Sequence, residues 1–207
     1  MLDPALRSGR LTAGLDTSVG RRDTPAERRA AKAEIDDPAV VFEAALRFLE
    51  ARARSQSEVR RRLIYAGYRP ELVDGAVLRL VELGLLDDET FARAWVESRD
   101  RARPRGERAL RRELALKGIE REVADEVLEE RRETAGEDVD VDLEAARHLI
   151  ARNLRALERV ADPRARRQRA YALLARSGFG PDVCRQASAE VVAGPGDDEI
   201  EPDPEPN

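Results

Sequence analysis

Apolar residues recur at intervals of three and four over most of residues 37–193, which is the spacing of one face of an α-helix. Several of these helical stretches end at a glycine, which is followed by one bulky apolar residue and then by another helical stretch. No segment shows the period-2 alternation that is typical of a half-buried strand. The pattern therefore predicts an all-α protein.

This unit of helix, glycine, apolar residue and helix occurs three times, with copies beginning at Ser57, Arg108 and Gln168. Successive copies are offset by 51 and 60 residues and align without gaps. Four sets of positions coincide: Leu63, Leu114 and Leu174; Gly67, Gly118 and Gly178; Tyr68, Ile119 and Phe179; Leu72, Val123 and Val183. Because a repeat of this size is one supersecondary unit stacked on its neighbours, we expect an elongated, curved helical array.

Capping and turn residues give each unit three helices. In the first unit, Asp37 is suited to cap the first helix, and Ser55 with Glu58 forms a capping box for the second. The second helix then stops at Gly67, the usual left-handed residue, and Pro70 starts a third. We therefore expect three tandem three-helix repeats.

The same signals mark the later units. Asp88 is predicted to cap the first helix of the second unit, which breaks at Pro104. The third unit opens near Leu143, pauses at Asp162 and ends near Val192. The predicted segments are an N-terminal extension that is disordered or weakly helical (1–36), repeat 1 (37–86), repeat 2 (87–133), an acidic linker (134–142), repeat 3 (143–193) and a disordered acidic tail (194–207).

Charge is abundant and unevenly distributed. Charged residues make up 38% of the chain, against about 25% in an average protein, and aromatic residues only 4%. All cationic residues except Lys32 and Lys117 are arginine, a bias that GC-rich coding alone could produce. Removing the six carboxylates of residues 197–207 changes the formal net charge from −5 to +1. This asymmetry points to a polyanionic partner, or to an acidic tail that competes with one.

Residues suited to catalysis or metal binding are few. His148 is the only histidine and Cys184 the only cysteine, and neither lysine lies in a phosphate-binding glycine-rich motif. For His148 a packing or surface position is favoured over a catalytic one, and for Cys184 a buried, inert thiol. Asp87, Asp88 and Glu89 lie at a predicted helix start, where capping is favoured over a Mg²⁺ site. We therefore expect neither an enzyme nor a cofactor.

No apolar stretch approaches the 18 residues of a membrane span, and the N-terminus lacks the apolar region of a signal peptide. These observations favour a soluble, cytoplasmic protein with no membrane partner. We also expect a monomer.

Paired arginines recur in register on the second helix of the first two repeats. Arg60 and Arg61 flank the predicted buried face of the first copy, and Arg111 and Arg112 hold the same places 51 residues later. Two further groups are the cluster around Pro104 and the start of the second helix of repeat 3: Arg101, Arg103, Arg105 and Arg108; Arg164, Arg166 and Arg167. Cations at a helix start are unfavourable for stability, which favours a binding role for the second group.

Guanidinium groups match phosphate bidentately, and a basic stripe binds nucleic acid independently of sequence, although the same groups also match carboxylates on a protein. Three-helix units also occur in Myb-like and homeodomain proteins, which read bases. The third helices of the first two repeats, however, lack the expected asparagine or glutamine. Contact with the nucleic-acid backbone is therefore favoured over base readout.

Four segments closely resemble the RecX family of recombination regulators: ALRFLEARARSQSEVRRRLIYAGY from Ala45, LGLLDDETFARAWVESR from Leu83, RGERALRRELALKGI from Arg105 and RRQRAYALLARSGF from Arg166. The resemblance covers roughly residues 40–190. It implies a protein of three tandem three-helix repeats that lies in the groove of the RecA–single-stranded DNA filament. It further implies inhibition of the ATPase, strand-exchange and co-protease activities of RecA.

The third copy departs from the family pattern. Tyr171 and Ala172 replace the arginine pair, and Ser177 stands where family members usually have a basic residue. Two alternatives to a filament regulator are a free-standing DNA-binding module, with single-stranded or duplex DNA as ligand, and a helical scaffold that binds no phosphate. We also hypothesise that the acidic tail competes with phosphate, so that deletion of residues 195–207 should tighten DNA binding at low salt.

Overall fold

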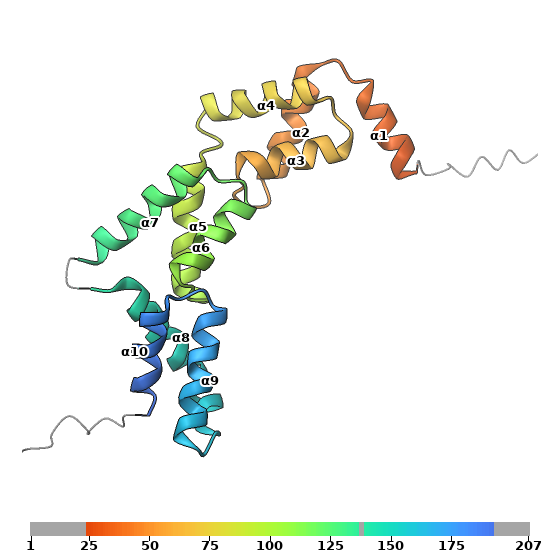
Figure 1. The fold of residues 1–207 in the computed structure, drawn as a ribbon. Coiled ribbons are helices and arrows are strands. Elements are labelled where there is room, and N and C mark those ends of the chain that lie inside the picture. Colours follow the sequence, from red (N-terminus) through yellow and green to blue (C-terminus); the bar gives the residue numbers. More distant parts are fainter. Residues whose placement is uncertain (1–23, 137–138, 193–207) are drawn as a thin grey trace, which may run out of the picture.

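The computed structural model describes residues 24–136 and 139–192, and in these ranges all regular secondary structure is helical. The helices follow one another along a curved array, with repeat 1 towards one end and repeat 3 at the other (Figure 1). The prediction of an all-α repeat array is therefore confirmed. The disorder predicted for the acidic tail and for the first part of the N-terminal extension concerns residues outside the described ranges.

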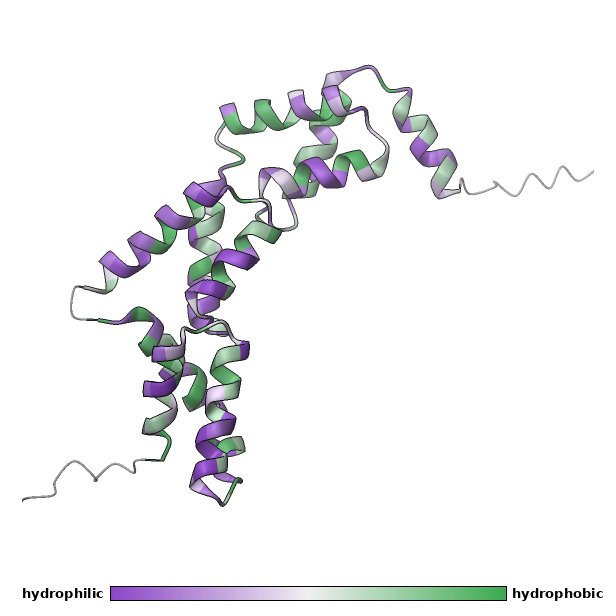
Figure 2. Cartoon of the chain, viewed as in Figure 1, coloured by the Kyte–Doolittle hydropathy of each residue, from purple (hydrophilic) through white to green (hydrophobic). Residues whose placement is uncertain are grey.

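Each repeat contains three helices and buries a separate apolar core. The leucines that coincide in the repeat alignment, Leu63, Leu114 and Leu174, are each at most 2% exposed. Figure 2 shows hydrophobic and hydrophilic residues on the same helices, as the amphipathic pattern predicts. The repeats comprise α2 (Pro38–Leu49), α3 (Gln56–Ala66) and α4 (Pro70–Glu82); α5 (Asp88–Ala102), α6 (Glu107–Leu116) and α7 (Arg121–Ala135); and α8 (Val141–Glu158), α9 (Pro163–Arg176) and α10 (Pro181–Glu190).

The second helices of the repeats abut end to end. The C-terminal turn of α6 lies against the N-terminus of α3, where the Ser55 hydroxyl donates to the Lys117 carbonyl at 2.6 Å. The C-terminal turn of α9 lies in the same way against α6, with the Gly106 amide donating to the Ser177 carbonyl at 3.2 Å. Helices α9, α6 and α3 therefore form a head-to-tail column along the array.

Capping follows the prediction with one exception. Asp37 caps α2, and Ser55 forms a full capping box with Glu58. The predicted cap Asp88 is wrong, because Asp87 has the extended backbone of an N-cap and accepts the amides of the first turn of α5. Asp88 is instead the first helical residue, and its carboxylate accepts the Gln56 amide of α3 at 2.9 Å.

Two segments predicted as non-repetitive contain helix. The N-terminal extension forms α1 (Pro25–Ala33), which begins with a capping box and lies against the glycine turn that ends α3. At the acidic linker, α7 continues to Ala135 and α8 begins at Val141, so helical residues occupy both of its ends.

Candidate nucleic-acid interface

The first arginine of each predicted pair is bound within its own repeat. The Nε atoms of Arg60 and Arg111 lie 2.7 Å from carboxylate oxygens of Asp74 and Asp125, each 14 residues later. The hydrogen bond to Asp125 raises the pKa of Arg111, and the same bond lowers the pKa of Asp125. We call these two pairs the helix clamps, because they join α3 to α4 and α6 to α7.

The second arginine of each pair faces solvent. The Nη2 atom of Arg61 donates to the Leu116 carbonyl at 3.3 Å, across the junction between repeats 1 and 2. Arg112 is exposed and has no ion-pair or hydrogen-bond partner among the described residues. Both arginines of each pair therefore lie at the surface, as the helix geometry predicts, but Arg60 and Arg111 are already ion-paired, whereas Arg61 and Arg112 form no ion pair among the described residues.

The arginines around Pro104 also divide into one that is bound within the repeat and others that face solvent. Arg105 is partly buried, with its Nε atom 3.5 Å from a Glu113 oxygen. Arg101 is 75% exposed, and its one ion pair with the described residues is a 3.8 Å contact with a carboxylate one turn earlier. Arg103 and Arg108 are exposed and have no partner in the described part of the chain. The outward charge of this cluster therefore comes from three arginines.

Repeat 3 presents two free arginines at the start of α9. Arg164 and Arg167 are exposed and have no ion-pair or hydrogen-bond partner within residues 24–136 and 139–192. Arg166 is half-buried and donates from Nε to the Val160 carbonyl at 3.1 Å, so its role is partly structural.

The tertiary structure also gathers a basic and aromatic corner on repeat 1. The Arg54 and Arg62 guanidinium carbons lie 4.2 and 5.8 Å from the centre of the Phe48 ring, and that of Arg29 lies 4.3 Å from the Tyr65 ring. This combination binds single-stranded nucleic acid in other proteins. The sequence did not single out these residues, because Phe48 lies on α2 and Arg54 lies in the loop that follows it.

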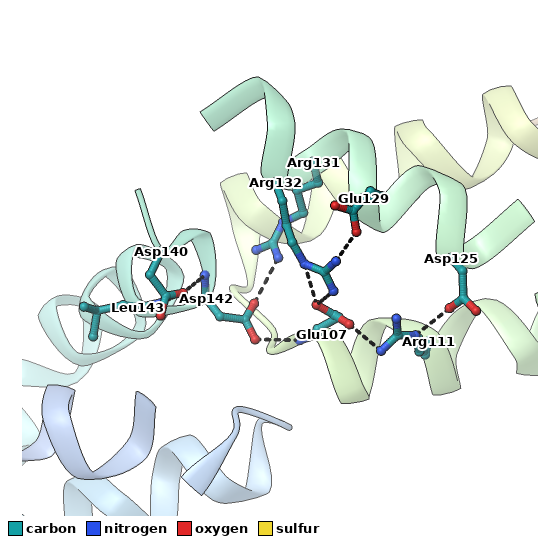
Figure 3. Close-up of polar contacts among 9 residues, drawn as sticks. All are labelled: Glu107, Arg111, Asp125, Glu129, Arg131, Arg132, Asp140, Asp142 and Leu143. Carbon is teal, nitrogen blue, oxygen red and sulfur yellow. Dashed lines mark hydrogen bonds and ion pairs between the residues drawn. The ribbon is translucent and has the colours of Figure 1, made fainter. Parts of the chain in front are cut away.

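A buried ionic junction fixes repeat 3 to repeat 2 (Figure 3). The Arg131 side chain is 9% exposed and binds Asp100 at 2.9 Å and Asp142 at 3.0 Å. Burial lowers the pKa of Arg131, but the hydrogen bonds to these carboxylates raise it above its usual value. Asp142 also accepts the Glu107 amide at the N-terminus of α6 at 3.0 Å. Arg131 is therefore a structural arginine.

The junction between repeats 1 and 2 uses the equivalent contact without a buried arginine. Asp88 takes the place of Asp142 by accepting the Gln56 amide, and burial raises its pKa. Beside it, Lys117 Nζ binds a Glu58 carboxylate oxygen at 2.7 Å. Both junctions therefore place a carboxylate of the following repeat at the N-terminus of a second helix.

Helix α4 presents an apolar surface that its counterpart α7 lacks. Leu78 is 61% exposed and Val81 and Leu85 are also exposed, whereas the residues equivalent to Leu78 and Val81 in α7 are Glu129 and Arg132. Figure 2 shows α4 as largely hydrophobic and α7 as largely hydrophilic. We call the exposed Leu78 and Val81 of α4, together with Leu85 just beyond the end of the helix, the α4 face.

The other residues considered for catalysis or metal binding have structural or surface positions in the described ranges. Cys184 is buried, which raises the pKa of its thiol, and His148 is exposed on α8. Within the described ranges, no three histidine, cysteine or acidic side chains are grouped to hold a metal ion. No helix in these ranges is long and apolar enough to cross a membrane.

Comparison with known proteins identifies all three repeats. The family models for the first, second and third three-helix domains of RecX match residues 42–80, 87–128 and 140–187. Two crystal structures share the fold: RecX from Lactobacillus salivarius (TM-score 0.63, 20% identity, 75% of this chain and 97% of that one) and a regulatory protein RecX (TM-score 0.60, 21% identity, 80% and 73%).

Curated relatives agree over most of the chain. The regulatory protein RecX of Mycobacterium avium (strain 104) is 37% identical over 150 residues, which cover 72% of this chain and 83% of the relative. The regulatory protein RecX of Mycobacterium leprae (strain Br4923) is 36% identical over 149 residues, which cover 72% and 84%. The chain therefore belongs to the RecX family.

Proposed function

We propose that this protein binds the RecA–single-stranded DNA filament and inhibits the ATPase, strand-exchange and co-protease activities of RecA. Family membership supports this role, since the relatives are named regulatory protein RecX. The observation that carries the proposal is the combination, on one curved array, of solvent-facing arginines in each repeat with an exposed apolar helix face.

The arginines are proposed to face the DNA. Arg61 and Arg112 hold equivalent places on successive repeats, and Arg101, Arg103 and Arg108 lie on the second of these repeats. Contacts from such groups release counterions from the phosphate backbone and carry no sequence preference. This pattern fits a nucleoprotein filament, in which the bases are not the target.

The α4 face is proposed to contact RecA itself. Exposed apolar side chains gain little from phosphate but bind protein surfaces by removing apolar area from water. The α4 face thus favours a filament regulator over the alternative, a free-standing DNA-binding module. We further propose that the protein acts as a cytoplasmic monomer, without catalysis or a cofactor of its own.

ATP hydrolysis by RecA on single-stranded DNA, measured during titration with this protein, tests the proposal. We expect hydrolysis to slow well below the concentration that coats bare DNA. Leu78→Asp should weaken this inhibition while leaving the affinity for bare DNA unchanged, and Arg112→Ala should weaken both.

Unchanged hydrolysis at a concentration that saturates the DNA would exclude the filament role. Inhibition that appears only when bare DNA is coated would favour the DNA-binding module. A scaffold that binds no phosphate would show no dependence of binding on salt.

A further inference from the structure

The groove between α9 and α10 is more positively charged than the equivalent helix pairs of repeats 1 and 2. It has a volume of about 280 Å³ and is lined by Arg164, Arg167, Gln168, Tyr171, Arg185 and Ser188. In repeats 1 and 2 the corresponding helix pair is closed by a helix clamp, whose arginine and aspartate neutralise each other. The clamp positions of repeat 3 are Tyr171 and Arg185, so the carboxylate of the clamp is replaced by a cation.

The arginines of this groove have few partners in the folded protein. Arg164 and Arg167 are exposed and unpaired within the described residues, and Arg185 pairs only with the highly exposed Asp182 in its own helix. Asp162, the nearest cap, accepts the backbone amides of the first turn. Three guanidinium groups therefore line the groove, and among the described residues only Arg185 has a carboxylate partner, the exposed Asp182.

The position of α9 at the end of the helix column makes its unpaired arginines less favourable for stability. Asp88 and Asp142 cover the N-termini of α3 and α6, but no further repeat in the described chain covers that of α9. Arg164 lies in its first turn, where the helix dipole disfavours a cation, and Arg167 follows one turn later. A bound anion would relieve both the dipole and the mutual repulsion of the arginines.

We propose that the α9–α10 groove binds the phosphodiester backbone of single-stranded nucleic acid, with Arg164, Arg167 and Arg185 on the phosphates. The planar guanidinium fork suits phosphate oxygens, and the exposed Tyr171 ring beside them offers a face for an unpaired base. The choice of ligand rests on the proposed function at a DNA filament. The site itself is new relative to the arginine pairs of repeats 1 and 2.

Binding of fluorescein-labelled oligothymidylate to the full-length protein, followed by anisotropy over a series of salt concentrations, tests the site. The double variant Tyr171→Arg/Arg185→Asp installs the helix clamp that repeats 1 and 2 already use, so its fold is expected to persist. We expect its affinity at low salt to fall at least about tenfold. The slope of log K against log salt should decrease by about 0.7 for each phosphate that the variant no longer neutralises.

Arg152→Ala, an exposed arginine on α8, changes the net charge by the same amount and should bind within about twofold of wild type. A second variant, Arg164→Ala/Arg167→Ala, removes two unpaired side chains and should show the same loss of affinity. It therefore tests the site even if the clamp variant fails to fold. Unchanged binding by the folded variants would overturn the site, as would an equal loss of affinity in Arg152→Ala.

RecA ATPase measured in parallel separates this site from the proposed function. Reduced DNA affinity in the groove variants supports the site even if wild-type protein fails to inhibit RecA. Reduced affinity for RecA alone, with DNA affinity unchanged, would mean that the groove binds protein carboxylates, and would overturn the proposal.

Discussion

Arg111 and Arg112 are neighbours in sequence, but their environments differ because the α-helix turns by about 100° per residue. Arg111 faces α7 and closes a helix clamp on Asp125, whereas Arg112 faces solvent. The same division separates Arg60 from Arg61 in repeat 1. At the scale of single residues, a recurring arginine pair therefore combines one structural cation with one that is available to a partner.

Single substitutions should separate these roles. We expect Arg112→Ala to weaken binding to single-stranded DNA and to cost less than about 0.5 kcal/mol of stability, as for most exposed positions. Arg111→Ala should largely preserve binding and lower the unfolding free energy by up to about 1 kcal/mol, the range of exposed ion pairs. Anisotropy and urea unfolding of both variants measure the two effects. Equally weakened binding in the two variants would show that the clamp arginine also contacts DNA.

Helices in this array meet neighbouring repeats through their ends. Gly178 has a φ of +89°, and a Cβ there would overlap Ala109 of the adjoining α6. Gly118 has the same relation to Ser57 of α3. At the scale of elements, each glycine therefore both ends a second helix and lets the next repeat approach closely.

Gly178→Ala should lower stability more than Gly84→Ala. Both glycines have positive φ, which costs an alanine about 1–2 kcal/mol, but a Cβ at Gly84 meets open space. The overlap with Ala109 should add about 1–3 kcal/mol, the usual cost of overpacking. Urea unfolding of the two variants isolates the second cost, and equal destabilisation would contradict the close approach.

Protonation of Glu58 by acid should weaken its contribution to the junction between repeats 1 and 2. Burial raises the pKa of Glu58, but the hydrogen bond and charge of Lys117, with Arg52 and the Ser55 amide, lower it below its usual value overall. A lowered folded-state pKa stabilises above the unfolded-state pKa, and this contribution is lost as the pH falls through the folded-state value.

Urea unfolding from pH 7 to pH 3 should therefore show a smaller loss of stability in Glu58→Gln than in wild type. An identical pH dependence in the two proteins would show that Glu58 does not contribute to acid sensitivity.

The whole molecule is held in its curve by junctions rather than by one continuous core. Each repeat has its own apolar core, and the contacts between repeats are helix ends and a few polar side chains. The nearly buried Arg131 binds Asp142 across the second junction and Asp100 within repeat 2. The spacing of the arginines along the array therefore depends on these junctions.

Arg131→Ala should loosen the array without unfolding its repeats. Removing one partner of a fully buried ionic contact costs about 3–5 kcal/mol, and the cost should be smaller here because Asp100 and Asp142 are partly exposed. The share carried by Asp142 falls on the junction, and the share carried by Asp100 falls on repeat 2 itself. Small-angle X-ray scattering should show a broader distribution of dimensions, while far-ultraviolet circular dichroism stays near wild type. Arg132→Ala, at the exposed neighbouring position, is the matched control, and an unchanged scattering profile for Arg131→Ala would contradict the junction's role.

The sequence by itself determined the helices, their glycine stops, the buried leucines and the repeat, because these follow from local spacing and from capping chemistry. It also gave a list of candidate arginines, whose role in binding stays a prediction. Only the tertiary structure decided which arginines are free, because a carboxylate 14 residues away on another helix decides whether Arg60 or Arg111 is already bound. The same is true of the junction at Arg131 and the groove at Arg185, where long-range packing brings together charges that the sequence keeps apart.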